Sequence, residues 1–203
     1  MRIGAVLLGA LACLLPFAAG AAERGGDRDW PCVQRLVPVL SAGTMWSGPS
    51  LDGIGDWRAE PAVSALVGRI APRSVSTADG EAAIGEFARG LSGDRQRLVT
   101  LAFAGLLDET NRERGEIIDR IKALAERQRS LADLVGRLTA ELDATPEPKG
   151  EPSPQRQELV DRWTYTSRTY NEVQRTMRYA CEVPGQLDAR LGAYARALEA
   201  ALS

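Results

Sequence analysis

The chain has 203 residues, of which 44% are hydrophobic and 26% charged, and it contains no histidine. Its length and composition are typical of one globular domain with at most an appendage, and the formal net charge of −2 argues against a nucleic-acid-binding protein, which needs a concentrated basic face. The lack of histidine excludes Ser-His-Asp or Cys-His catalysis, His-ligated zinc or haem, and a histidine pH switch.

The stretch 1–22 has the pattern of a cleavable signal peptide. Arg2 precedes an apolar run over residues 3–20, and the small residues at 19–22 favour cleavage before Glu23. A transmembrane anchor is the alternative, because a run of about 18 apolar residues nearly spans a bilayer. A late proline and the lack of basic residues directly after the run favour cleavage. The sequence therefore predicts a periplasmic or secreted protein with no membrane span after signal cleavage.

Two cysteines follow the predicted signal peptide, Cys32 and Cys181. An oxidising exported compartment and an even cysteine count predict a Cys32–Cys181 disulfide. A pair of redox-active thiols is the alternative, but the sequence has no C-x-x-C motif and no local charge cluster that would lower a thiol pKa. We expect a structural bridge.

Residues 23–59 form a segment rich in tryptophan, glycine and proline. Pro31 is suited to the first position of a short helix with apolar residues between Val33 and Leu40, which Pro38 would kink or shorten. Residues 42–57 lack periodicity and are expected to be irregular.

Three of the four tryptophans, Trp30, Trp46 and Trp57, lie in this segment. They have two interpretations. They seal one end of a small helical bundle, as the usual burial of tryptophan favours, or they form a rigid aromatic patch that binds a partner.

Helical periodicity begins after residue 60. Residues 63–70 carry an apolar stripe that ends before Pro72, and residues 84–91 carry another, with Asp79 as a candidate N-cap and Gly93 as a candidate stop. No stretch alternates with period two for long enough to predict a sheet, so the sequence predicts an all-α protein.

The strongest pattern lies in residues 94–143, which contain no proline. Apolar residues there alternate in steps of four and three, which is the heptad seam of a coiled coil. The seam positions are Ile117, Ile121, Leu124, Gln128, Leu131, Val135, Leu138 and Leu142. Residues 145–154 contain four prolines and form a turn.

A second heptad helix is predicted from about residue 155 to 181. Its seam positions are Leu159, Trp163, Thr166, Tyr170, Val173, Met177 and Ala180. The short turn implies that the two helices pack antiparallel, with Trp163 near Val135.

Val183-Pro184-Gly185 is expected to end this second helix, with a final helix from about residue 186 to 202. The fold class that follows is a small helical bundle base with a long antiparallel coiled-coil hairpin. The predicted organisation of the chain is a signal peptide at 1–22, a Trp-rich segment at 23–59, and at 60–203 the helical bundle with the coiled-coil hairpin as its stalk.

The sequence shows no recognisable catalytic, cofactor-binding or metal-ligating residues. Paired carboxylates such as Glu109 and Glu113 alternate with basic residues, which favours an exposed charged face over a calcium or magnesium site. A Gly-rich phosphate loop, a G-x-S-x-G motif and a C-x-x-C-H motif are all missing.

The function we expect is that of an exported, non-enzymatic helical scaffold or accessory protein. It would bind a protein partner or self-associate through an exposed stalk face or through Trp30, Trp46 and Trp57. The alternative is a helical carrier protein that binds a small ligand or a metal ion.

Overall fold

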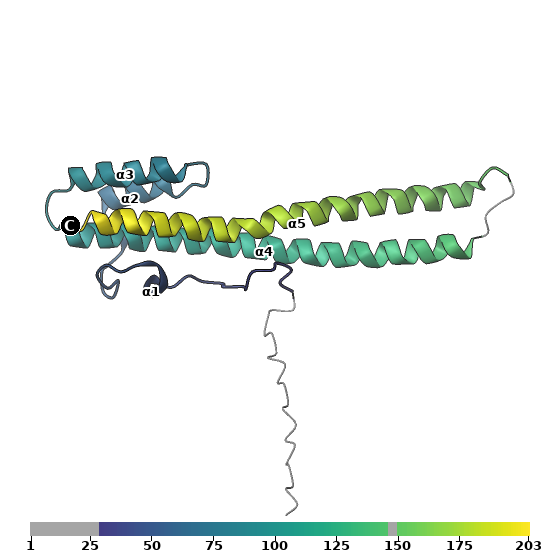
Figure 1. Ribbon diagram of the computed structural model, residues 1–203, viewed down its shortest axis with the longest axis horizontal. Helices are drawn as coiled ribbons and strands as arrows, with labels where there is room; N and C mark the ends of the chain where they lie inside the picture. Colours follow the sequence, from purple (N-terminus) through teal and green to yellow (C-terminus); the bar gives the residue numbers. More distant parts are fainter. Residues whose placement is uncertain (1–28, 146–149) are drawn as a thin grey trace, which may run out of the picture.

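The computed structural model describes residues 29–145 and 150–203, and within them it contains helices and no strand. The predicted all-α fold class is confirmed. Figure 1 shows two long helices lying antiparallel, with the shorter helices gathered at the end where the chain terminates. The elements are α1 (Ala42–Met45), a 3₁₀ turn (Trp57–Ala59), α2 (Pro61–Ile70), α3 (Thr77–Gly90), α4 (Arg95–Ala144) and α5 (Pro154–Ala200).

Helix α4 continues from Arg95 to Ala144 because its sequence contains no proline that would interrupt it. The side chain of Asp94 caps its first turn by accepting a hydrogen bond from the Arg97 amide at 3.0 Å. At the start of α5, the Ser153 hydroxyl caps in the same way, and Pro154 occupies a first-turn position where its missing N–H costs nothing.

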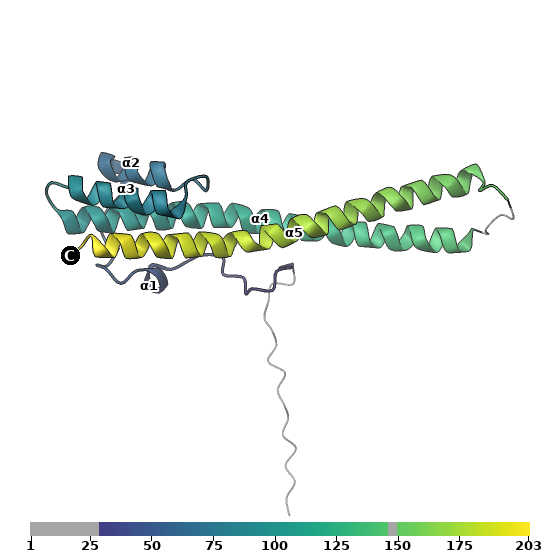
Figure 2. The same cartoon turned by 45° about the horizontal axis from the view of Figure 1, so that its top comes forward.

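The two heptad seams face each other along the hairpin, as the sequence predicts. Every seam position is buried or half-buried except Trp163, whose residue surface is 37% exposed. The Trp163 indole N–H donates to the Thr139 hydroxyl at 3.0 Å, so Trp163 lies about one turn further along α4 than the predicted Val135. In Figure 2 the two helices cross each other, as expected for a supercoiled pair.

The predicted helix break at residues 183–185 is wrong, because α5 continues through Pro184 to Ala200. A proline inside a helix removes one hydrogen bond and clashes with the preceding turn, at a cost of about 3 kcal/mol. Tertiary contacts nevertheless hold this part of α5 in place. Pro184 is buried, its carbonyl accepts from Arg114 Nη1 at 3.0 Å, and the Cys181 carbonyl accepts from Gln34 Nε2.

The base of the molecule is where α2 and α3 pack against the near ends of α4 and α5 (Figure 1). Its core is formed by aliphatic side chains from all four helices, and the predicted stripes at 63–70 and 84–91 contribute to it. The most deeply buried large residues include Val63, Val67, Ile70, Ile84, Val99, Leu101, Phe103, Leu106, Leu191 and Leu198.

Two local predictions for the base need correction. Ser76, and not Asp79, is the N-cap of α3, because its hydroxyl accepts from the Asp79 amide at 3.1 Å. Asp79 is the third residue of the helix, and its carboxylate accepts from the Ser76 hydroxyl at 2.7 Å. Helix α3 ends at Gly90, and Gly93, with φ +101°, forms the turn before α4.

The predicted short helix near residues 33–40 is also wrong. Residues 29–40, called the strap below, contain no helix and run along the hairpin. The two prolines of the strap disfavour helical hydrogen bonding. Its last residue is held by a paired contact, in which the Leu40 amide donates to Asn111 Oδ1 at 2.8 Å and Asn111 Nδ2 donates to the Leu40 carbonyl at 3.0 Å.

Gly105 in α4 is buried where α2 and the 3₁₀ turn approach most closely. A Cβ atom at Gly105 would lie 2.8 Å from Val67 Cγ2 and 2.9 Å from Trp57 Cδ2. Gly105→Ala would gain about 1 kcal/mol of helix propensity but introduce an overlap costing about 1–3 kcal/mol. We expect a net loss of about 1 kcal/mol in the free energy of unfolding, measured by urea denaturation.

Gly115→Ala is the matched control, because a Cβ atom at Gly115 of the same helix would meet nothing within 4 Å. This control should raise the free energy of unfolding. If both substitutions stabilise the protein equally, the close packing of Trp57 on α4 is incorrect.

Candidate functional site

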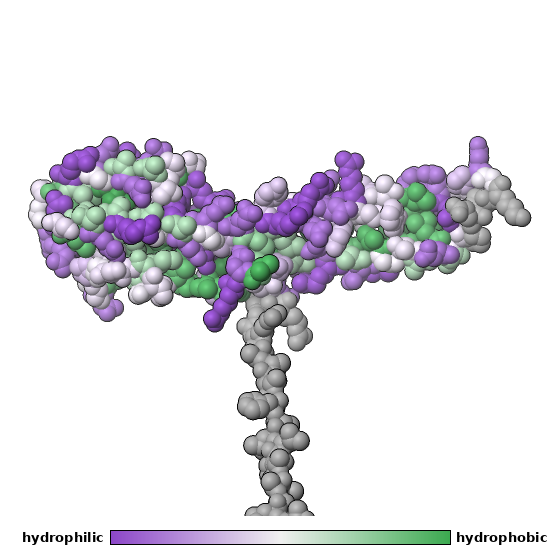
Figure 3. All heavy atoms as spheres, viewed as in Figure 1, coloured by the Kyte–Doolittle hydropathy of each residue, from purple (hydrophilic) through white to green (hydrophobic). Residues whose placement is uncertain are grey.

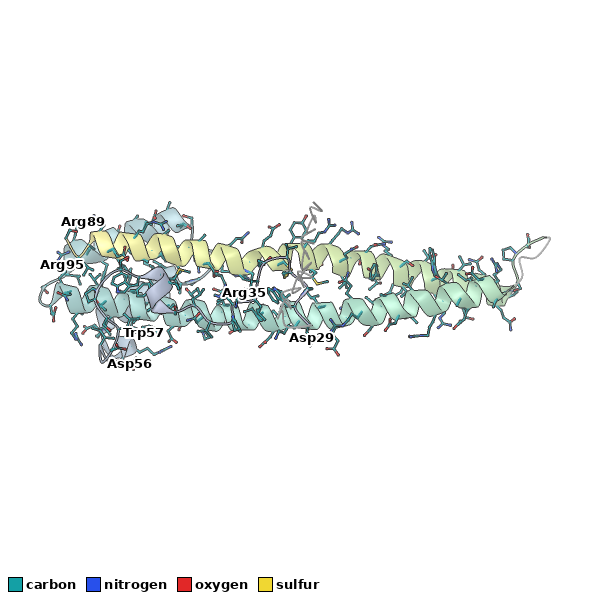
Figure 4. All side chains as sticks on the ribbon, turned by 60° about the horizontal axis from the view of Figure 1, so that its bottom comes forward. Asp29, Arg35, Asp56, Trp57, Arg89 and Arg95 are labelled. Atoms are coloured by element: carbon teal, nitrogen blue, oxygen red, sulfur yellow. A yellow bond between two sulfur atoms is a disulfide. The ribbon has the colours of Figure 1, made fainter. Side chains whose placement is uncertain are left out.

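The strap crosses the hairpin near the middle of α5, where a disulfide holds it. The predicted Cys32–Cys181 bridge is present, with Cα atoms 5.6 Å apart and a sequence separation of 149 residues. Figure 4 places Asp29 and Arg35 of the strap along the middle of the hairpin, away from Asp56 and Trp57 at the base. The bridge thus fixes the start of the strap to the part of α5 just before Pro184.

Polar contacts reinforce the disulfide. The Trp30 indole N–H donates to the Gln34 carbonyl at 2.7 Å, and Arg129 of α4 forms an ion pair with Asp29 at 3.1 Å. Together with the bond from Gln34 to the Cys181 carbonyl, these contacts hold the first residues of the strap against both long helices.

Arg114 is the buried polar residue that joins the strap to both long helices, and it is only 2% exposed. Its guanidinium donates to the Pro184 carbonyl at 3.0 Å and to the Val37 carbonyl at 2.5 Å, and forms an ion pair with Asp188. A buried arginine needs partners for its charge and its donors, and here one side chain links the strap, α4 and α5.

Burial raises the pKa of the Asp188 carboxyl above its ordinary value of 3.8, and the positive charge of Arg114 opposes this increase. Desolvation is the larger of these two opposing effects. The folded state therefore binds the Asp188 proton more tightly than the unfolded state does.

This shift gives a pH prediction with a definite sign. Because the folded pKa is raised, the stabilisation from protonated Asp188 is complete below about pH 4 and is lost as the pH rises through the folded pKa. The free energy of unfolding of the wild type, minus that of Asp188→Asn, should therefore fall between pH 3 and pH 7. A difference that rises with pH would contradict the burial of this carboxyl.

A groove of about 890 Å³ lies beside the disulfide, between the strap and α5. Its strap wall is formed by residues 31–34, and α4 contributes Gln128. Helix α5 contributes Gln174, Met177, Arg178, Cys181, Glu182, Gly185, Gln186 and Ala189. Val33 is fully exposed there, and Figure 3 shows hydrophobic atoms at the middle of the lower edge of the molecule. The groove therefore combines an apolar surface with several amide side chains.

The structure places the three tryptophans in different surroundings. Trp46 is 9% exposed, and its ring stacks on that of Phe103 in the base, with ring centroids 4.5 Å apart. Trp57, also in the base, donates from its indole N–H to Asp108 at 3.2 Å. Trp30 is half-buried in the strap. Trp30 is thus the tryptophan that lies in the same segment as the groove.

Sequence reasoning missed Arg114 and the groove. Arg114 precedes Ile117 by three residues and Ile121 by seven, so it continues the heptad seam of α4 toward the base. A charged residue in a seam position was therefore the available signal. Which residues line the groove depends on where the strap lies on the hairpin. The strap sequence has no periodicity from which that position could be predicted.

The described residues contain no cluster of three or more His, Cys, Asp or Glu side chains that could hold a metal ion. No helix in the described ranges 29–145 and 150–203 is long and apolar enough to cross a membrane. The predicted signal peptide at 1–22 lies outside the described residues.

Comparisons of the chain with models of protein families, with curated proteins and with solved structures found no match. Functional inference therefore depends on this chain's own residues.

Proposed function

We propose that the protein is an exported, non-enzymatic helical scaffold or accessory protein that binds a protein partner or a second copy of itself. The observation that carries the proposal is the groove beside the disulfide, where Val33 is fully exposed on the strap. Exposed apolar surface beside polar residues is typical of protein interaction sites.

The construction of the strap supports this proposal. Its backbone follows no regular structure, yet a disulfide, the buried Arg114 and the Asn111 pair hold it in place. A rigid, preorganised surface loses less conformational entropy when a partner binds. The disulfide also fits the oxidising, exported compartment that the sequence predicts.

The long hairpin supplies a second surface for the same role. Large side chains remain exposed on the outer face of α5, with Tyr165 74% and Tyr179 73% exposed. Tyrosine is enriched in protein interfaces because it combines a large contact area with a polar group. Tyr165 and Tyr179 are fourteen residues apart, so they lie on the same side of α5, which suits a helix that other proteins contact.

Cross-linking mass spectrometry of the protein purified from the exported fraction of its own host, with sedimentation velocity, tests the proposal. The expected result is a stoichiometric second chain, with cross-links to the strap or to α5. A protein that sediments as a monomer and gives no cross-link to another chain would contradict it.

A carrier of a small ligand or a metal ion is the second candidate function. The groove volume of about 890 Å³ favours it, because small-molecule sites usually have volumes of about 300–1,000 Å³. Native mass spectrometry of the same purified sample separates the two functions. A bound small molecule or ion at one equivalent would support the carrier, whereas an added protein mass would support the scaffold.

A further inference from the structure

Four glutamines line the groove, and they come from three different elements of the fold. Gln34 lies in the strap, Gln128 in α4, and Gln174 and Gln186 in α5. A glutamine side chain carries both hydrogen-bond donors and an acceptor, and it is uncharged. This is the donor and acceptor set that a peptide backbone requires.

Most of this hydrogen-bonding capacity is unused within the described part of the chain. The Gln34 amide donates to the Cys181 carbonyl, and the side chains of the other three glutamines make no hydrogen bond to a described residue. The two charged residues that line the groove, Arg178 and Glu182, carry opposite charges one helical turn apart. The groove therefore has no net charge that would select an anion or a cation.

The strap backbone also offers unpaired groups. No backbone–backbone hydrogen bond joins residues 31–39 to any other described residue. Three strap carbonyls are occupied by side chains: Gln34 accepts from Trp30, Val37 from Arg114, and Leu40 from Asn111. The strap N–H groups at residues 32–34 remain available for a chain that lies alongside.

The apolar part of the groove sets a further requirement on its occupant. Pro31, Val33, Met177 and Ala189 line it, and the side chain of Val33 is fully exposed. Burying an aliphatic side chain of this size raises the affinity of a complex by about tenfold or more. An occupant must therefore present an apolar side chain as well as backbone amides.

We propose that the groove binds an extended, uncharged segment of a partner polypeptide that lies alongside the strap and places an apolar side chain against Val33. The neutral lining, the unpaired strap backbone and the glutamines on facing elements all match a peptide main chain. Extended peptides bind in this way when main-chain hydrogen bonds supply affinity and a pocket for a side chain supplies specificity. This inference rests on the proposed function, and it names the chemistry of the partner.

A displayed library of random 12-residue peptides, selected against the oxidised full-length protein, tests the inference. A selected peptide is then labelled with fluorescein, and its Kd is measured by fluorescence anisotropy. We expect Val33→Ser and Gln174→Ala to weaken binding, the first by about tenfold or more and the second by about two- to tenfold. Because both side chains are exposed, neither substitution should change the thermal unfolding midpoint.

Two controls separate peptide binding in the groove from adhesion to the protein surface. Gln155→Ala, at an exposed position in the first turn of α5, should leave the Kd unchanged. The same peptide with N-methylated backbone amides should bind at least tenfold more weakly, because it loses its main-chain donors. Equal binding of the N-methylated peptide, or equal binding by the two groove variants and the wild type, would overturn the inference.

The result also distinguishes this inference from the proposed function. If the library yields no groove binder, while cross-linking still captures a protein on the outer face of α5, the inference fails and the scaffold function remains. If cross-linking captures no second chain, the scaffold function fails and the inference fails with it.

Discussion

Replacing Cys32 and Cys181 together by serine should lower the free energy of unfolding by about 5 kcal/mol. The bridge closes a loop with a sequence separation of 149 residues, and cross-linking so long a loop removes a large conformational entropy from the unfolded chain. The double substitution avoids leaving a free thiol. Urea denaturation followed by far-UV circular dichroism measures the effect, and the native helical signal should be retained before the transition.

A reductant provides the control for this prediction. It should destabilise the wild type to the level of the double variant and leave the double variant unchanged. A loss below about 1 kcal/mol would mean that the disulfide does not restrict the unfolded chain as the loop-entropy account requires.

Replacing Arg114 by methionine should lower the free energy of unfolding by about 2–3 kcal/mol, because it leaves the partly buried Asp188 carboxylate without its counter-ion. The substitution also removes the donor from the carbonyls of Pro184 and Val37. Methionine preserves much of the side-chain volume, so a cavity contributes little to the loss. The transition midpoint in urea gives the change in stability.

Two further variants isolate the buried pair. Arg112→Met removes an exposed arginine that forms ion pairs with Glu109 and Glu116 in the same helix, and it should cost less than about 1 kcal/mol. Replacing Arg114 by methionine and Asp188 by leucine together should recover part of the loss, because no unpaired charge then remains. Equal effects of Arg112→Met and Arg114→Met would contradict the burial of Arg114.

The hairpin could be predicted from the sequence because its signal is local and repeated. Each seam residue of α4 is followed by another after three or four positions, and the four prolines at 145–154 leave a turn as the only connection. Hydrophobic periodicity over this length outweighs single exceptions such as Gln128. The same reasoning placed the second seam up to Ala180, apart from Trp163, which is exposed and contacts Thr139 rather than Val135.

The continuation of α5 through Pro184 could not be predicted, because the contacts that hold the helix there are tertiary. Arg114 lies 70 residues earlier in the chain and Gln34 lies 150 residues earlier, yet Arg114 donates to the carbonyl of Pro184 itself and Gln34 donates to that of Cys181. A local sequence pattern indicates that a proline disfavours a helix, but it cannot indicate that a distant segment supplies a hydrogen-bond donor there.

The disulfide is the only part of the candidate site that was predicted from the sequence. The cysteine count identified the Cys32–Cys181 pair, and that pair fixes where the strap crosses α5. The composition of residues 23–59 drew attention to the tryptophans, but Trp46 packs against Phe103 in the core. The glutamines of the groove lie far apart in the sequence and belong to no motif. The fold brings them together only because the strap lies against the hairpin.

We propose that a partner contacts the strap at the point where the disulfide fixes it to α5. Photo-cross-linking in the host that makes the protein tests this most directly, with benzoylphenylalanine introduced at Val33 in one variant and at Arg89 of the base in another. Both positions are exposed. We expect a discrete adduct of higher mass from the Val33 position and none from Arg89. An adduct from Arg89 alone would contradict the claim.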